Sequence, residues 1–190
     1  FLSAVPDGNA LAVRSGLVLW LDASDVDADG NPNNNPVNDA TVAAWRDRSG
    51  LGHDADNPDG SSPRYMSTGL NAKPVLYFDG NSYLFTTYDF DVHTEYSLFS
   101  VARYTGGDSE RVIGSRSHNW LFGFYGNGDE KWHAEGWIYN GGNGNTDWHL
   151  HAGTINDDVN PAADFWKDGH QLVANSLGSH DTVYGPGLLG

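Results

Sequence analysis

The sequence predicts an all-β protein folded as a two-sheet antiparallel β-sandwich. Apolar and polar residues alternate in short runs, which is the period-2 pattern of strands with one buried face. Helical periodicity is nearly absent, and Gly, Asn and Pro separate about ten such runs without any internal repeat. With 190 residues, 38% of them hydrophobic and 13% aromatic, the chain is long and apolar enough for one domain with a real core.

The first half of the chain offers three predicted elements. Residues 17–21 form the first strand, where leucines alternate with Val18 and Trp20, so both faces are expected to be buried. Residues 41–48 are the helical candidate, flanked by capping residues, although β-branched Thr41 and Val42 fit a strand equally well. Residues 75–78 and 83–86 are predicted to form a hairpin around Asp79-Gly80-Asn81.

The second half is predicted to hold longer strands. They span residues 96–104, 111–114, 120–125, 132–139 and 148–155, and residues 165–174 form a hairpin through Asp168-Gly169. Alternation also assigns faces. Trp148 shares a face with Leu150 and Ala152 and is predicted to lie in the core, whereas Trp137 and Tyr139 are predicted to point outward.

The charge of the chain restricts its partners. A formal net charge of −15 and a pI of about 4.5 create a negative field that disfavours nucleic acids and anionic lipids.

There is no cysteine, so disulfides and thiolate metal sites are excluded, and no apolar run approaches the roughly 20 residues of a membrane-spanning helix. Because the chain begins with Phe1, we expect a processed, extracellular product.

An acidic loop is the strongest metal-site candidate. Asp25, Asp27, Asp29 and Asn31 alternate along the loop, and Gly30 stands at its sixth position, as in loops that wrap calcium with oxygen ligands. The twelfth position is Pro36, where an EF-hand carries a bidentate Glu. The sequence therefore predicts a calcium site completed by other oxygens, for which Asp22, Asn33 and Asp39 are candidates. A solvated acidic turn is the alternative.

A second set of residues is predicted to bind a ligand. His149 and His151 lie two apart on one predicted strand and therefore share a face, and His133 is expected on a neighbouring strand. No spacing fixes a zinc site, so these histidines are predicted to line an open, concave sheet face. Trp137 and Tyr139 are expected beside them, because aromatic rings stack on sugars and on apolar partner groups.

The catalytic carboxylate pattern of sandwich-type glycosidases is missing. Such enzymes need two carboxylates about 5.5 Å apart, from alternate positions of one strand. Glu130 and Glu135 are five residues apart and would lie on opposite faces of a regular strand. No nucleophile elbow or phosphate loop is present either. We therefore expect a non-catalytic protein, with a glycan-active enzyme as a remote alternative.

Five motifs follow one another along the chain: Gly16-Leu-Val-Leu-Trp-Leu-Asp-Ala-Ser-Asp25 with the acidic loop and Trp45-Arg-Asp-Arg-Ser-Gly-Leu-Gly-His-Asp-Ala55, Pro74-Val-Leu-Tyr-Phe-Asp-Gly80, residues 96–104, Trp148-His-Leu-His-Ala-Gly153, and Phe165-Trp-Lys-Asp-Gly169. In this order they resemble bacterial laminin-G-like, concanavalin A-like domains. The resemblance covers roughly residues 16–190 and implies a jelly roll, frequently with calcium and a sugar or protein ligand at its loops. It implies no single function.

The two ends of the chain suggest assembly. Residues 16–190 are expected to form the laminin-G-like domain, which lacks the closing strand that the resemblance places after Gly190. Residues 1–15 are an N-terminal extension, and the apolar residues 1–13 are predicted to join copies by strand exchange, or to fold back as the missing strand. The predicted function is an extracellular module that binds a glycan or a protein. The alternative is a structural subunit of a filament or surface assembly.

Overall fold

The computed structural model describes residues 14–57, 59–90, 95–106, 111–156, 162–176 and 185–190. Every paired strand in these residues is antiparallel, and the strands form four sheets. No α-helix lies in the described ranges, and residues 41–48 contain the short strand β1 (Ala44–Trp45) instead. The predicted all-β class is confirmed. The predicted segment 1–13 lies outside the described residues.

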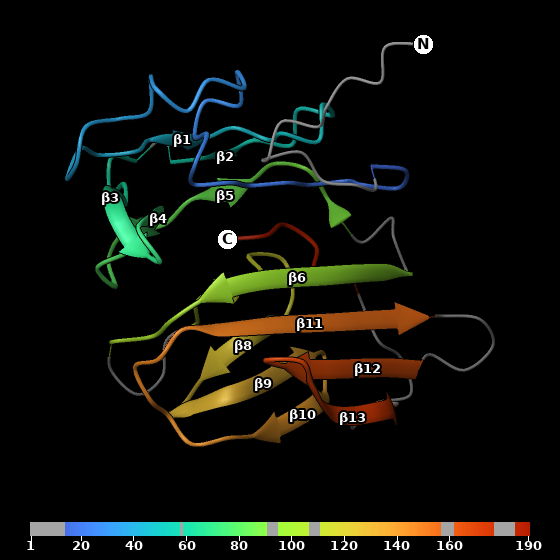
Figure 1. Cartoon of the computed structure of the whole chain (residues 1–190). Helices are drawn as coiled ribbons and strands as arrows, with labels where there is room; N and C mark the ends of the chain where they lie inside the picture. Colours follow the sequence, from blue (N-terminus) through green and yellow to red (C-terminus); the bar gives the residue numbers. More distant parts are fainter. Residues whose placement is uncertain (1–13, 58, 91–94, 107–110, 157–161, 177–184) are drawn as a thin grey trace, which may run out of the picture.

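Two four-stranded sheets, here called the sheet pair, make up the larger part of the fold (Figure 1). The first has the order β10-β9-β8-β7 and consists of β7 (Ile113–Gly114), β8 (Trp120–Tyr125), β9 (Gly128–Ala134) and β10 (Trp137–Gly141). The second has the order β13-β12-β11-β6 and consists of β6 (Tyr96–Ala102), β11 (His149–Asn156), β12 (Ala162–Lys167) and β13 (His170–Ser176). The predicted hairpin through Asp168-Gly169 is confirmed, since β12 pairs with β13.

The inner faces of the sheet pair share one aromatic core. Buried side chains from both sheets form this cluster: Trp120, Phe122, Trp132, Ala134, Ile138, Ile155, Ala163 and Phe165. Gly153 lies among them on β11, where an added Cβ would stand 2.7 Å from the Trp132 ring and 2.8 Å from Phe122. The missing side chain at Gly153 thus lets the two large rings of the opposite sheet pack against β11.

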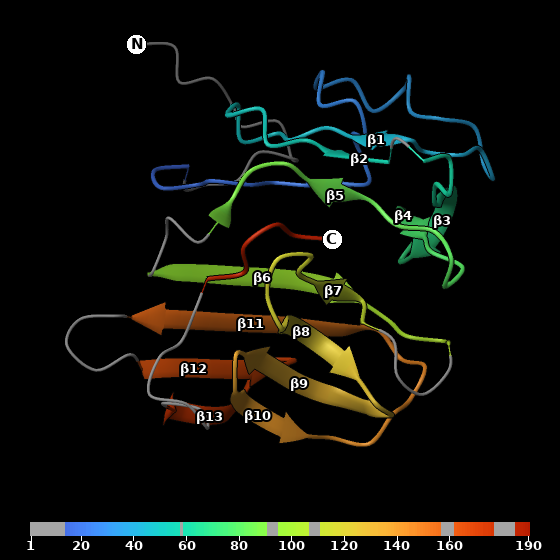
Figure 2. The same cartoon turned by 180° about the vertical axis from the view of Figure 1, so that it is seen from behind.

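The described residues between 14 and 90, here called the N-terminal layer, form the other two sheets beyond the β6 edge (Figures 1 and 2). One sheet has the order β1-β2-β5, with β2 (Ala55–Asp56) and β5 (Phe85–Thr86), and the other pairs β3 (Arg64–Leu70) with β4 (Lys73–Tyr77). A small core of Val26, Val42 and Tyr65 lies inside this layer.

Two predicted elements of this layer are wrong. Residues 75–78 and 83–86 form no hairpin, because β4 pairs with β3 and β5 pairs with β2. The carboxylate of Asp79 accepts the backbone N–H groups of Asn81 and Ser82 and closes a local turn without strand pairing. Residues 17–21 are half-buried and outside any strand, since the N–H of Trp20 donates to the Asp47 carboxylate instead of to a neighbouring strand.

The last residues of the chain join the two parts of the molecule. Leu188 forms a β-bridge with Asp89 and Leu189 forms one with Ser115. The N–H of Thr86 donates to Leu189 O at 2.9 Å, and the N–H of Gly114 donates to Gly190 O at 2.7 Å. The segment therefore lies between β5 and β7 and ties the N-terminal layer to the sheet pair.

Candidate functional site

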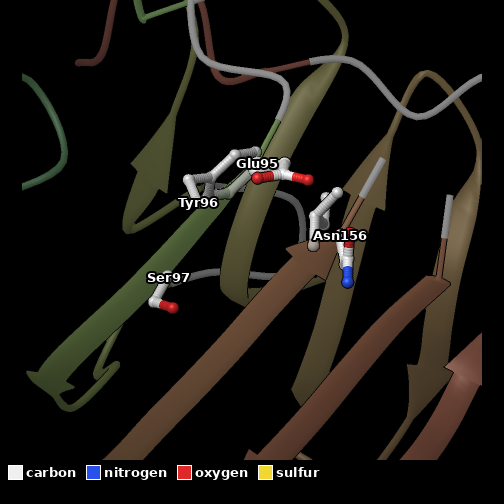
Figure 3. A pocket seen from close by; sticks show the side chains of 5 residues that line it. Glu95, Tyr96, Ser97 and Asn156 are labelled. Carbon is white, nitrogen blue, oxygen red and sulfur yellow. The ribbon is translucent and has the colours of Figure 1, made fainter. Parts of the chain in front are cut away.

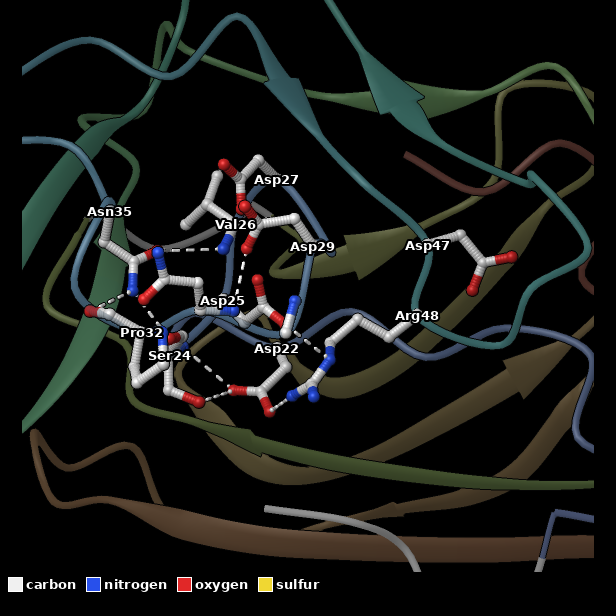
Figure 4. A network of polar contacts seen from close by, with 12 residues as sticks. Asp22, Ser24, Asp25, Val26, Asp27, Asp29, Pro32, Asn35, Asp47 and Arg48 are labelled. Atoms are coloured by element: carbon white, nitrogen blue, oxygen red, sulfur yellow. Dashed lines mark hydrogen bonds and ion pairs between the residues drawn. The ribbon is translucent and has the colours of Figure 1, made fainter. Parts of the chain in front are cut away.

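The acidic loop of the N-terminal layer brings three carboxylates together. One oxygen from each of Asp25, Asp27 and Asp29 lies within 4.8 Å of the others (Figure 4). Asp25 is buried, while Asp27 and Asp29 are exposed. The alternating positions at which the sequence predicts metal ligands therefore converge, and this cluster could hold a metal ion.

The loop is wound around the side chain of Asp25, which is only 2% exposed. Its Oδ2 accepts the backbone N–H of Gly30 at 3.0 Å, and Gly30 has a φ of +83°, a conformation that glycine adopts without strain. Its Oδ1 has no hydrogen-bond partner. A buried carboxylate oxygen without a partner is costly, and a cation would satisfy it. The residues present thus fit an oxygen-liganded divalent cation.

Arg48 supplies a positive charge beside this cluster. Its guanidinium is 3.0 Å from Asp25 Oδ2 and 2.7 Å from Asp22 Oδ2, and it lies over the Trp20 ring at 4.2 Å. Arg48 thus pairs with Asp22 and Asp25, and among the described residues no ion pair joins a cation to Asp27 or Asp29. A divalent cation would neutralise these two carboxylates.

The pKa of Asp27 also reflects an excess of negative charge in this loop. Desolvation by burial, and then repulsion by the Asp29 carboxylate, raise the pKa of Asp27 above its ordinary value. Asn34 partly relieves this repulsion, because its Nδ2 donates to Asp27 at 3.1 Å and to Asp29 at 2.7 Å. Sequence reasoning missed Asn34. Rotating its amide by 180° would present Oδ1 to a cation instead, so Asn34 joins the candidate ligands.

The other expected ligands have different partners. Asn31 is exposed and its side-chain oxygen accepts the N–H of Asn33 at 3.1 Å. Asp22 accepts Ser24 and pairs with Arg48, and Asp39 pairs with Arg64 at 2.9 Å. Asp22 and Asp39 are therefore held by neighbouring groups and lie outside the three-carboxylate cluster.

The expectation that His149 and His151 line an open face is wrong. His149 is buried and His151 is 0% exposed. The Nδ1 of His149 lies 2.7 Å from Asp168 Oδ2, while Nε2 of His151 lies 2.7 Å from Asp129 O and its ring stacks on Phe165. The face of β11 that carries His149, His151 and Gly153 is therefore the buried face, where Asp168 and Asp129 bind the two histidines.

Leu150 consequently lies on the outer face of β11, and Trp148, which immediately precedes this strand, does not lie in the core as predicted. Trp148 is half-buried under the guanidinium of Arg103, which lies 5.1 Å from its ring centre, and Leu150 is exposed. The prediction for Trp148 was wrong because the size of an aromatic side chain does not show which face of a strand is buried.

Trp137 and His133 do lie on the outer face of the first sheet, as predicted. They are cross-strand partners on β10 and β9, their rings are 4.9 Å apart, and both are half-buried. A β-bulge between Trp137 and Tyr139 shifts the register, so Tyr139 pairs with Trp132 and packs against the core. The predicted outward position of Tyr139 is therefore wrong.

No family model, curated protein or solved structure matches the chain. The laminin-G-like resemblance of the motifs stays a prediction from the sequence. In the described part of the chain, no helix has the length and apolar character needed to cross a membrane.

Proposed function

We propose that this chain is a non-catalytic, calcium-stabilised binding module of the laminin-G-like type, acting outside the cell on a glycan or a protein. The observation that carries the proposal is the convergence of Asp25, Asp27 and Asp29, together with the buried Oδ1 of Asp25, which has no hydrogen-bond partner. Calcium takes about six to eight oxygen ligands, which three carboxylates, Asn34 and backbone carbonyls of the loop would supply in part. The remaining positions would belong to water or a ligand.

We include in this proposal that the fold is a concanavalin-like jelly roll. A concanavalin-like jelly roll consists of two antiparallel sheets around one core. The two four-stranded sheets with a shared aromatic cluster support this assignment. In this reading, the N-terminal layer carries the calcium loop at one edge of the sandwich.

The ligand surface that we favour is centred on Trp137. The ring of Trp137 lies beside His133 at 4.9 Å and Tyr125 at 6.3 Å, and Lys131 Nζ lies 6.0 Å from the Trp137 ring centre. Half-buried aromatic rings next to a cation suit the apolar faces and hydroxyl groups of sugars. His149 and His151 are excluded from this surface by their burial.

Thermal unfolding with calcium or with a chelator tests the metal site. We expect calcium at a hundredfold excess over Kd to add about 2.7 kcal/mol to the free energy of unfolding. The gain should be greater at pH 7 than at pH 4, because protons compete for Asp27, whose pKa is raised. Asp27→Asn should lose most of this gain, and the control Asp39→Asn should keep it, since Asp39 pairs with Arg64. Superimposable melts with calcium and chelator would remove calcium from the proposal.

A glycan array probed in calcium tests the binding function itself. We expect selective binding that Trp137→Ala abolishes and Trp148→Ala preserves, because Trp137 lies on β10, whereas Trp148 lies just before β11 in the other sheet, beside Arg103. A folded protein that binds no glycan would leave only the protein-ligand form of the proposal. Catalytic release of sugar from the array ligands would contradict the non-catalytic assignment.

A further inference from the structure

The two ends of strand β11 have different polar surroundings. At its C-terminal end lies an open hollow, where Glu95 and Ser97 are exposed beside Asn156 (Figure 3). At its N-terminal end, His149 is buried among charged and amide side chains. Water can solvate the groups of the open hollow, whereas buried polar groups need partners within the protein. The buried end of β11 therefore requires a defined arrangement of hydrogen-bond donors and acceptors.

Six side chains, here called the His149 cluster, connect four parts of the sheet pair. They are His149 at the start of β11, Asp129 and Glu130 of β9, Lys167 of β12 with Asp168 in the turn that follows it, and Asn145 in the loop 142–148 between β10 and β11. Lys167 Nζ lies 3.1 Å from Asp129 Oδ2 and 2.6 Å from Glu130 Oε1. The cluster thus contains three carboxylates and one lysine, and a protonated His149 would reduce this excess of negative charge.

The other neighbours of the His149 ring leave its charge to the cluster. Phe124 of β8 is apolar, and its ring centre lies 6.1 Å away. His151, at 6.0 Å, is neutral near pH 7 because burial lowers its pKa. Asp147 is exposed in the loop, and the guanidinium of Arg103, after the end of β6, lies over an indole ring. The protonation of His149 therefore depends mainly on the residues that hydrogen-bond to its two ring nitrogens.

The orientation of the Asn145 amide is fixed by two contacts. Its Nδ2 donates to Asp129 Oδ2 at 2.7 Å, and its Oδ1 accepts the backbone N–H of Asp147 at 2.8 Å. A flipped amide would place oxygen against oxygen and N–H against N–H. Because Asn145 Oδ1 is an acceptor, Nε2 of His149, which lies 3.0 Å away, must donate to it. The same nitrogen lies 3.2 Å from Asp129 Oδ2, which is a second acceptor.

The other ring nitrogen of His149 also faces an acceptor, because Nδ1 lies 2.7 Å from Asp168 Oδ2. Burial alone would raise the pKa of Asp168, but hydrogen bonds from His149 and from the Leu150 N–H outweigh it and lower this pKa. The carboxylate is therefore ionised and can only accept, so Nδ1 must donate as well. All these contacts are satisfied together only when His149 carries a proton on each ring nitrogen.

We propose that His149 is a pH-sensitive switch, which holds the loop 142–148 on the sheet pair when both ring nitrogens are protonated and releases the loop when one proton is lost. The remaining proton stays on Nδ1, because the contact with Asp168 is the shorter one and its acceptor is charged. Nε2 then presents a lone pair to the oxygens of Asn145 and Asp129, which repel it. Histidine is the side chain suited to this role, since it changes charge between about pH 5 and 8.

Asn145 is the side chain through which the switch acts on the loop. Residues 142–147 are exposed, and the Asn145 amide reaches from them to both His149 and Asp129. The backbone N–H of Asp147 donates to Asn145 Oδ1, and that of Gly144 donates to a carbonyl oxygen in the turn between β8 and β9. These two amides therefore report whether the loop is held.

Nitrogen-15 NMR of the His149 ring in the whole chain tests the proton arrangement. We expect protons on both ring nitrogens at pH 5.5 and on Nδ1 alone at pH 8. A ring with a single proton at both pH values, or with two protons at both, would overturn the proposal, because no proton would then be exchanged between the two conditions.

Hydrogen exchange of the Gly144 and Asp147 amides tests release of the loop. After correction for the intrinsic exchange rate, we expect their protection to fall about tenfold or more from pH 5.5 to pH 8. His149→Gln should remove this pH dependence, because glutamine does not titrate. His170→Gln, at an exposed position of β13, is the matched control and should keep it. Constant protection in the unmodified chain, or a pH dependence that persists in His149→Gln, would contradict the switch.

Asp168→Asn tests the assigned proton positions and stays informative if His149→Gln does not fold. The new amide accepts the Leu150 N–H and donates to Nδ1 of a neutral His149, which leaves the single ring proton on Nε2 for Asn145. Asparagine also suits the φ of +51° at this position. We therefore expect this variant to keep the loop protected at pH 8. A loop that is still released at pH 8 would overturn the proposed mechanism.

Discussion

The sheet pair and the N-terminal layer are stabilised by different kinds of interaction. In the sheet pair, strands of five to eight residues predominate, and Trp120, Phe122, Trp132 and Phe165 are buried together between the two sheets. In the N-terminal layer, β1, β2 and β5 have two residues each, and the apolar cluster of Val26, Val42 and Tyr65 has only three buried members. The hydrophobic effect therefore contributes far more to the sheet pair than to the layer.

Buried carboxylates organise the N-terminal layer instead. Asp47 is buried and accepts the N–H groups of Trp20, Ser49 and His53 at 2.8 to 3.0 Å, and the Ser49 hydroxyl at 2.6 Å. Asp25 organises the neighbouring loop through Gly30 and Arg48. A sequence with short strands can hold long loops in place when a few ionised side chains satisfy many backbone donors. The layer should therefore depend on pH and on cations more than the sheet pair does.

Truncating the aromatic core should have the largest effect. Trp132→Ala removes a fully buried ring that packs edge-on against Phe122 and Phe165, and we expect a loss of about 3 to 5 kcal/mol in the free energy of unfolding. Trp148→Ala is the control on the outer face and should cost about 1 kcal/mol or less. Urea unfolding measures both values. Equal losses would contradict the face assignment of β11.

Removing the central carboxylate of the N-terminal layer should have an intermediate and local effect. Burial alone would raise the pKa of Asp47, but hydrogen bonds from Ser49, Trp20 and His53 outweigh it and hold this pKa below its ordinary value. Its stabilisation is therefore complete above the ordinary aspartate pKa of about 3.9 and is lost as the pH falls through the lowered pKa of the folded state. We expect Asp47→Asn to cost about 1.5 to 3 kcal/mol.

Hydrogen exchange can locate the effect of Asp47→Asn. The amides of Trp20 and His53 donate to this carboxylate and should exchange faster in the variant, whereas those of β8 and β9 should keep their rates. Asp56→Asn, at a half-exposed position 3.5 Å from Arg46, serves as the control and should leave both regions unchanged. Uniformly faster exchange in both regions would show that the layer and the sheet pair unfold as one unit.

The difference between the sheet pair and the N-terminal layer also explains which features the sequence could predict. Most strands of the sheet pair follow from alternation, because regular strands place every second residue on one face. The acidic loop is equally local, so the spacing of Asp25, Asp27 and Asp29 was sufficient to predict their convergence. Asn34 was missed because its contact with Asp27 and Asp29 depends on how the loop returns, which no short motif encodes.

The wrong assignments depend on tertiary partners. Alternation shows that His149 and Leu150 lie on opposite faces of β11, but it does not show which face is buried. That choice follows from Asp129 and Asp168, which bind the two histidines, and from the close packing at Gly153. Tyr139 moved to the core through a bulge, which shifts the register by one residue without a sequence signal of its own.

The smallest expected effect concerns pH and the sheet pair, where His151 is a buried titratable group within the aromatic core. Nε2 faces the carbonyl oxygen of Asp129 and must donate to it, while Nδ1 has no partner. A second proton on Nδ1 would find no acceptor among the surrounding Phe122, Phe124 and Phe165 rings. Desolvation by burial accordingly lowers the pKa of His151 below its ordinary value.

The sign of the pH dependence follows from this lowered pKa. Below the ordinary histidine pKa of about 6.5 the unfolded chain binds a proton that the folded chain does not, so stability is complete above that pH and falls below it, by up to about 1.4 kcal/mol per pH unit. His151→Phe should remove this contribution, although it loses the hydrogen bond to Asp129 and about 1 kcal/mol at pH 7.5. We therefore expect the variant's free energy of unfolding to fall less steeply than that of the unmodified chain between pH 7.5 and 5.5, measured by urea unfolding. Identical slopes would mean that His151 takes up its proton in the folded protein, and that the sheet pair is more open to water at β11 than its burial indicates.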